Sequence, residues 1–192
     1  MVRVIIGAIP AAVAMFLLGF IFYATPLSRL ATGGVEDAQA AAIQQALNAN
    51  LSSTGTYVVP DPSTPAQSVM YGQGGVATIH FSTGRYAAVE TTSLVIGFLL
   101  DFVVALLIGA ALIGIDRRVP DFASRGRLVV FIAVAASAYV NLLSPIFYHH
   151  GWGHFIYRFI ADALTLSAGG LIIARWFLSS ARAAPTGAPT EV

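Results

Sequence analysis

The stretch SLVIGFLLDFVVALLIGAALIGI, residues 93–115, is apolar except for Ser93 at its start and one charged side chain, Asp101. An α-helix needs about 20 predominantly apolar residues to cross the hydrocarbon core of a bilayer. The sequence therefore predicts an all-α membrane protein, because further runs reach a similar length and complete a bundle of four transmembrane helices. These further runs are Val4–Ala24, Leu128–Tyr148 and Phe155–Phe177.

The composition agrees with this prediction and excludes several classes of protein. Of the 192 residues, 57% are hydrophobic and only 10% are charged, and the mean hydropathy is +0.77. A soluble domain carries about 25% charged residues, and a disordered chain needs low hydrophobicity. The formal net charge of +1 offers no broad basic surface, so we expect no nucleic-acid partner. The absence of cysteine excludes disulfides and thiolate metal sites.

The arginines indicate how the four runs are oriented in the membrane. Several lie between the second and third runs, whereas the long connection 25–92 contains only Arg29 and Arg85. Cytoplasmic loops carry an excess of basic residues, so both termini and the second connection are predicted to be cytoplasmic. We expect the first run, within 1–24, to be a retained anchor, because no A-x-A-like cleavage site follows it. The arginines of the second connection are Arg117, Arg118, Arg125 and Arg127.

The segment 25–92 is predicted to fold as a small α/β cap between the first and second transmembrane helices. A helix is expected to start at 34–37, because apolar residues then recur at helical spacing from Ala40 to Leu51. Two β-prone runs, 56–59 and 76–81, predict a short β ribbon. Transmembrane helices 2–4 fill 93–178, and a disordered cytoplasmic tail is expected over 179–192. The prolines expected to break any continuation of the first strand are Pro60, Pro62 and Pro65.

Four polar side chains inside the apolar runs form a candidate functional cluster: Asp101, Asn141, Arg158 and Asp162. At about 1.5 Å of rise per residue, all four fall at a similar depth in the outer half of the membrane. Ionisable groups inside a span are costly and mark functional sites by default. We expect Arg158 and Asp162, one turn apart, to pair, and Asp101 to share the guanidinium or the amide. The cluster either bridges helices or lines an outward-opening pocket with an apolar floor.

Three histidines lie between the third and fourth runs: His149, His150 and His154. Neutral imidazole is the commonest metal ligand, so these residues are a candidate metal site near the outer surface. Their spacing matches no zinc signature, and histidine and aromatic residues also suit the membrane–water interface as amphipathic anchors. The sequence contains no Walker loop, no G-x-S-x-G elbow and no H-E-x-x-H pair. We therefore predict no catalytic residue and no cofactor.

Two short motifs resemble a group of small four-span bacterial inner-membrane proteins of unknown function. The first is GTYVVP at 55–60, a G-x-Y-x-x-P step, and the second is the glycine-led β run at 74–81. The order of an anchor, an outer segment and three closing spans extends the resemblance over most of the chain. It implies a bacterial inner (cytoplasmic) membrane with the cap 25–92 in the periplasm, and it implies no activity.

Three functions remain open on these observations. The first is a non-catalytic accessory or structural subunit of a larger membrane complex, because small residues on the helix faces suit packing against another membrane protein or a second copy. The second is a membrane protein that binds a lipid or small ligand in an outward-facing pocket around the polar cluster. The third is a metal-dependent membrane enzyme that uses the three histidines. Membrane lipids are partners in every case.

Overall fold

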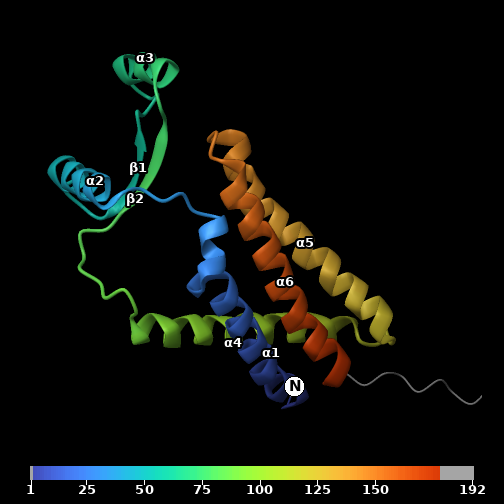
Figure 1. The fold of residues 1–192 in the computed structure, drawn as a ribbon. Coiled ribbons are helices and arrows are strands. Elements are labelled where there is room, and N and C mark those ends of the chain that lie inside the picture. Colours follow the sequence, from blue (N-terminus) through green and yellow to red (C-terminus); the bar gives the residue numbers. More distant parts are fainter. Residues whose placement is uncertain (1, 178–192) are drawn as a thin grey trace, which may run out of the picture. The chain divides into compact units, whose positions relative to one another are not determined.

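The computed structural model describes residues 2–177, and within them four helices are long and apolar enough to cross a membrane (Figure 1). A small α/β insert lies in the chain between the first and second of these helices, so the predicted fold class is confirmed. The tail predicted to be disordered, 179–192, lies outside the described residues. The four helices are α1 (Val2–Ala24), α4 (Thr91–Ile115), α5 (Phe122–Phe147) and α6 (Trp152–Trp176).

Helix α5 begins earlier than the hydropathy predicts. The apolar run starts at Leu128, whereas the helix starts at Phe122. Asp121 is the N-cap residue, and its carboxylate accepts a hydrogen bond of 2.8 Å from the backbone N–H of Ser124. This bond satisfies one of the donors that a helix N-terminus leaves without an intrahelical partner. The additional residues place Arg125, which the hydropathy assigns to a loop, inside the helix.

Helix α6 is the centre of the bundle, because it packs against both α1 and α5 (Figure 1). A Cβ atom at Gly170 would lie 2.5 Å from Cγ1 of Val129 on α5. A Cβ atom at Gly169 would lie 2.5 Å from Sδ of Met15 on α1. Small residues allow this close approach, which van der Waals packing in a membrane requires. Further buried small residues are Ala8, Ala11 and Ala12 on α1 and Ala161, Ala163 and Ala174 on α6.

Helix α4 joins the bundle through α1 and contacts α6 only lightly. Gly109 lies directly against Val4 of α1, and the rings of Phe16 and Phe98 meet edge to face with centroids 5.9 Å apart. Helix α4 is inclined to α5 and α6, and it reaches α5 through the short connection 116–121 (Figure 1). Although α4 and α5 are consecutive, neither is the main packing partner of the other.

The end of α1 is tied to the start of α6 through a short 3-10 helix, η1 (Pro26–Leu30). The Tyr157 hydroxyl donates a hydrogen bond of 2.7 Å to the backbone carbonyl of Phe22. Nδ1 of His154 is hydrogen-bonded to the backbone carbonyl of Ala31 at 2.9 Å. These bonds occupy carbonyl groups that the ends of α1 and η1 leave without an intrahelical partner.

Residues 33–90 form a second compact unit. Its two strands pair antiparallel, with Gly55 opposite Phe81 and Val59 opposite Ala77. The predicted β ribbon is therefore present, but the unit has two helices where one is predicted. The elements of the unit are α2 (Asp37–Asn50), β1 (Gly55–Val59), α3 (Pro65–Gln73) and β2 (Ala77–Phe81).

The additional helix, α3, begins at Pro65, one of the three prolines that follow the first strand. Proline is favoured at the first position of a helix, where its fixed φ is suitable and its missing N–H has no partner to lose. Thr64 provides the N-cap, because its hydroxyl accepts a hydrogen bond of 3.3 Å from the backbone N–H of Gln67. Pro65 therefore starts a helix, and β1 already ends at Val59, before the three prolines.

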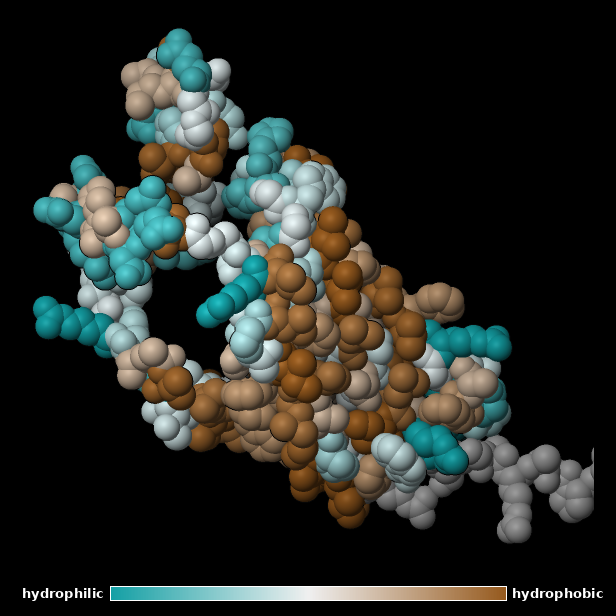
Figure 2. Space-filling view, in the orientation of Figure 1, coloured by the Kyte–Doolittle hydropathy of each residue, from teal (hydrophilic) through white to brown (hydrophobic). Residues whose placement is uncertain are grey.

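This α/β unit has almost no interior of its own. Within 33–90, all of which the structure describes, Pro60 is the only buried residue. Apolar side chains such as Ile43 and Met70 are exposed. Figure 2 shows hydrophilic side chains over much of the insert and hydrophobic side chains over the helices of the bundle. A two-stranded ribbon without a covered apolar face is marginally stable in water.

Candidate functional site

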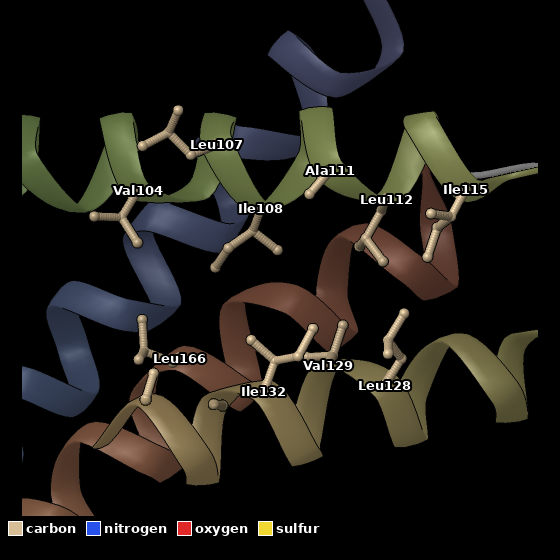
Figure 3. A pocket seen from close by; sticks show the side chains of 12 residues that line it. Val104, Leu107, Ile108, Ala111, Leu112, Ile115, Leu128, Val129, Ile132 and Leu166 are labelled. Atoms are coloured by element: carbon tan, nitrogen blue, oxygen red, sulfur yellow. The ribbon is translucent and has the colours of Figure 1, made fainter. Parts of the chain in front are cut away.

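Helices α4 and α5 enclose an apolar groove with a volume of about 300 Å³, which we call the α4–α5 groove. Side chains from the two helices point toward one another across it (Figure 3). All of its lining residues are apolar, so the groove offers dispersion contacts and no hydrogen bond. Representative lining residues are Val104, Ile108 and Leu112 from α4, Val129 and Ile132 from α5, and Leu166 from α6.

A buried arginine holds the connection between the two walls of this groove. The Arg125 side chain is 1% exposed and forms an ion pair with Asp116, which lies just after α4. Its Nε also donates a hydrogen bond of 2.7 Å to the backbone carbonyl of Val119. The hydropathy of the sequence gives no sign of this role, because it marks Arg125 only as one of several loop cations. The Arg125 contacts fix the end at which α4 and α5 meet.

A second space, which we call the polar cavity, lies beside the groove and has a volume of about 290 Å³. Four polar side chains line it among apolar neighbours. Three residues, Val104, Ala136 and Leu166, line both the polar cavity and the α4–α5 groove. The two spaces are therefore adjacent, and polar and apolar surroundings meet at these shared wall residues within the bundle. The polar lining residues are Asp101, Ser137, Asp162 and Thr165.

Asp162 is held by side chains from two other helices. The Tyr23 hydroxyl of α1 donates a hydrogen bond of 2.8 Å to Oδ1 of Asp162. Nδ2 of Asn141 on α5 donates a bond of 2.9 Å to Oδ2, and a second bond of 3.0 Å to the backbone carbonyl of Ser137. Asp162 therefore connects α1, α5 and α6. Tyr23 is missing from the sequence-based cluster, because at the end of its apolar run it resembles an ordinary interfacial aromatic residue.

Asp101 and Ser137 have no such partners. The Asp101 carboxylate lines the polar cavity and makes no hydrogen bond or ion pair with any described residue. The Ser137 side chain is 2% exposed, and within residues 2–177 its Oγ has no hydrogen-bond partner. Buried hydroxyl groups normally have a partner, so a buried serine without one, in the wall of a cavity, points to a missing ligand or water.

Arg158 lies apart from the other three residues of the predicted cluster. Its side chain is exposed, and among the described residues it forms no ion pair with Asp162. It lies close enough to the Tyr23 hydroxyl to act on it electrostatically. The expected pair does not form, because both Asp162 oxygens accept hydrogen bonds from interior groups while the guanidinium lies outside. The polar cavity consequently contains two carboxylates and no cationic side chain.

The three histidines have separate surroundings. His150 is stacked between the rings of Tyr148 and Phe155, with centroids 5.7 Å and 5.4 Å away. His154 is engaged by the carbonyl after η1, and His149 has a positive φ of 55° at the turn. In the part of the chain that the structure describes, no three or more His, Asp or Glu side chains gather as a group able to hold a metal ion.

Comparison with known protein families, curated proteins and solved structures finds no match to this chain. The resemblance to small bacterial four-span proteins is therefore supported only in its coarse feature, the four apolar helices.

Proposed function

We propose that this protein is a non-catalytic protein of the bacterial inner membrane that binds a membrane lipid. The hydrocarbon chain of the lipid occupies the α4–α5 groove, and its polar group occupies the polar cavity. The observation that carries this proposal is that an entirely apolar space adjoins a polar one inside a membrane-spanning bundle, with three wall residues in common. A lipid has the same division into an apolar chain and a polar end.

The size of the groove favours a hydrocarbon chain over a helix from another protein. Its wall on α4 runs from Val104 to Ile115, about 16 Å at 1.5 Å per residue. A helix with its side chains is about 10 Å wide, so a segment of that length would occupy more than about 1,000 Å³. Measured up to the atoms of its walls and including its open side, the groove offers about 820 Å³, which is less than a helix needs and suits a single narrow chain.

The predicted orientation gives the bound lipid a direction. With the arginine-rich connection 116–121 in the cytoplasm, the Arg125 end of the groove is cytoplasmic, and the polar cavity lies on the periplasmic side. The polar group of the lipid then lies in the outer half of the bilayer, and its chain extends toward the inner half.

A groove-filling substitution tests this function. Ala111 lines the groove, whereas its neighbour Ala110 does not, and both residues are exposed on α4. A phenylalanine at position 111 displaces the chain, while one at position 110 projects into the surrounding lipid. Native mass spectrometry of the full chain, released from mild detergent, measures the retained lipid. We expect at least about tenfold weaker retention in Ala111→Phe, equivalent to about 1.4 kcal/mol, and no change in Ala110→Phe.

Two results would contradict the proposal. One is a wild-type protein that retains no lipid after extraction in mild detergent. The other is equal retention in the wild type and both variants, provided that circular dichroism shows both variants to be folded.

A second candidate function, an accessory subunit of a larger membrane complex, is favoured by the insert. The unit 33–90 buries only Pro60 among its own residues, which leaves its apolar side chains available for a partner. Chemical cross-linking in intact membranes, followed by mass spectrometry, tests this candidate. Cross-links from Glu36 or Asp61 to a different membrane protein or to a second copy support it, whereas cross-links confined to one chain count against it.

A further inference from the structure

We infer that the polar cavity selects a primary ammonium group, so that the bound amphiphile carries a cationic amine at its polar end. This inference rests on the proposed function and adds the chemistry of the polar group. It starts from the different roles of the two carboxylates in the cavity. Asp162 is already bound by Tyr23 and Asn141, whereas Asp101 has no partner among the described residues.

The unpaired carboxylate calls for a positive charge. An ionised carboxylate inside a membrane-spanning bundle is costly unless it is paired. The cavity contains no lysine, arginine or histidine side chain, and Arg158, the nearest basic residue of α6, is exposed and outside the lining. A cationic group on the ligand supplies the missing partner of Asp101.

The orphaned hydroxyl group of Ser137 narrows the choice of cation. Its Oγ is covered by neighbouring atoms and has no hydrogen-bond partner within residues 2–177, so a rotation about χ1 is needed to turn the hydroxyl into the cavity that Ser137 lines. A primary ammonium has three N–H donors and no acceptor, so it can donate to the Asp101 carboxylate and to the Ser137 hydroxyl together. A quaternary ammonium carries the charge but has no N–H donor, so it leaves Ser137 unsatisfied.

Other polar ends fit the cavity less well. An alcohol offers one donor and no charge, so it leaves the Asp101 carboxylate without a counter-ion. A carboxylate or phosphate brings a further negative charge beside Asp101 and Asp162 and is repelled. The expected order of affinity for a fixed hydrocarbon chain is therefore amine, then alcohol, then acid.

Three amphiphiles with the same chain test this order: dodecylamine, dodecanol and dodecanoate. The full-length protein is titrated with each at pH 7 in mild detergent, and native mass spectrometry measures the bound fraction. The amine stays ionised, because an alkyl ammonium resembles lysine with a pKa of about 10.4. We expect at least about tenfold tighter binding of dodecylamine than of dodecanol, about threefold weaker amine binding in Ser137→Ala, and no amine preference in Asp101→Asn.

Asp121→Asn is the matched control, because it also removes one carboxylate but does not line the cavity. It should leave unchanged the order of affinity for dodecylamine, dodecanol and dodecanoate. Equal binding of the three amphiphiles, or a preference for dodecanoate, overturns the ammonium inference even where Ala111→Phe still abolishes lipid retention, in which case the proposed function stands. If none of the three amphiphiles binds, both the ammonium inference and the proposed lipid-binding function are overturned. Should Asp101→Asn not fold, the wild-type order and Ser137→Ala decide the inference.

Discussion

Helix α5 meets α6 through a closed seam and α4 through an open groove, although both contacts are apolar. At the seam, Gly170 of α6 lets Val129 of α5 approach directly. Across the groove, branched side chains such as Ile108 and Ile132 point toward each other from α4 and α5 (Figure 3). Lipid tails are as apolar as leucine, so hydrophobicity does not decide which helix faces close in a membrane. Glycine lets the seam between α5 and α6 close, whereas the inclined α4 leaves an apolar space against α5 that stays available for a lipid.

The largest effect is expected where the two walls of the groove meet. Arg125→Ala removes a buried side chain together with its hydrogen bonds to Asp116 and to the Val119 carbonyl, and the loss of these bonds and of the buried volume costs about 3 kcal/mol. Unfolding in mixed micelles of increasing denaturing detergent measures the change in free energy. Arg127→Ala, an exposed change two residues away, is the control and should have little effect. Equal losses in the two variants would show that the contacts of Arg125 do not hold the connection.

The next largest effect is expected at the closed seam. In Gly170→Val, the new side chain collides with Val129, and overpacking of a close contact costs about 2 kcal/mol. The same unfolding measurement applies. Gly97→Val is the matched control, because a Cβ atom at Gly97 on α4 meets nothing within 4 Å. If Gly170→Val and Gly97→Val lower the free energy of unfolding equally, the distinction between the closed seam and open helix faces is wrong.

A smaller effect is expected at the polar cavity, where substitutions distinguish the structural role of Asp162 from the binding role of Asp101. Tyr23→Phe removes a hydrogen bond to Asp162 and should lower the free energy of unfolding by about 1 kcal/mol, typical of polar contacts between membrane helices. It should leave the preference for dodecylamine unchanged. Asp101→Asn should do the reverse: it should abolish the preference for dodecylamine without lowering the free energy of unfolding, because it removes an unpaired carboxylate. A Tyr23→Phe variant that loses the amine preference would show that structural and binding roles are not divided in this way.

The smallest effect is expected at the start of α5. The hydrogen bond from the backbone N–H of Ser124 holds the pKa of Asp121 below its ordinary value. A lowered pKa in the folded state means that the cap stabilises α5 fully above pH of about 4 and loses this contribution as the pH falls through the lowered pKa. Asp121→Asn caps without titrating, so its melting temperature should fall less on acidification than that of the wild type. If the melting temperatures of the two proteins fall equally on acidification, Asp121 does not contribute to the pH dependence of stability.

The four spans were predictable because hydropathy is a local property of each segment. The meeting of Asn141 and Asp162 also follows from local quantities, since helical phase and depth place both on inward faces at one level. Tyr23 and the exposed position of Arg158 depend on how α1 and α5 surround α6, which no single run encodes. In the insert the additional element has a local cause, because Thr64 provides the N-cap and Pro65 takes the first position of α3, a pair of residues typical of a helix start.

The α4–α5 groove was not predictable from the sequence. The apolar halves of the second and third runs predict an apolar floor beneath the polar cluster. The same pattern is expected whether the two helices are in contact or separated, so it does not predict a groove. The separation depends on the inclination of α4, which its contact with α1 determines. It also depends on the buried contacts of Arg125, a residue that the hydropathy places in a loop.

Photo-cross-linking from the wall of the groove tests the central claim most directly. A benzophenone amino acid replaces either Ile132, which lines the α4–α5 groove, or Phe131, which is 71% exposed and lies outside it. The protein is extracted into mild detergent and washed before irradiation, and mass spectrometry identifies the adducts. A lipid adduct at position 132 with detergent adducts at position 131 is the expected result. Detergent adducts at both positions, or a peptide of another protein attached at position 132, would contradict lipid binding in the groove.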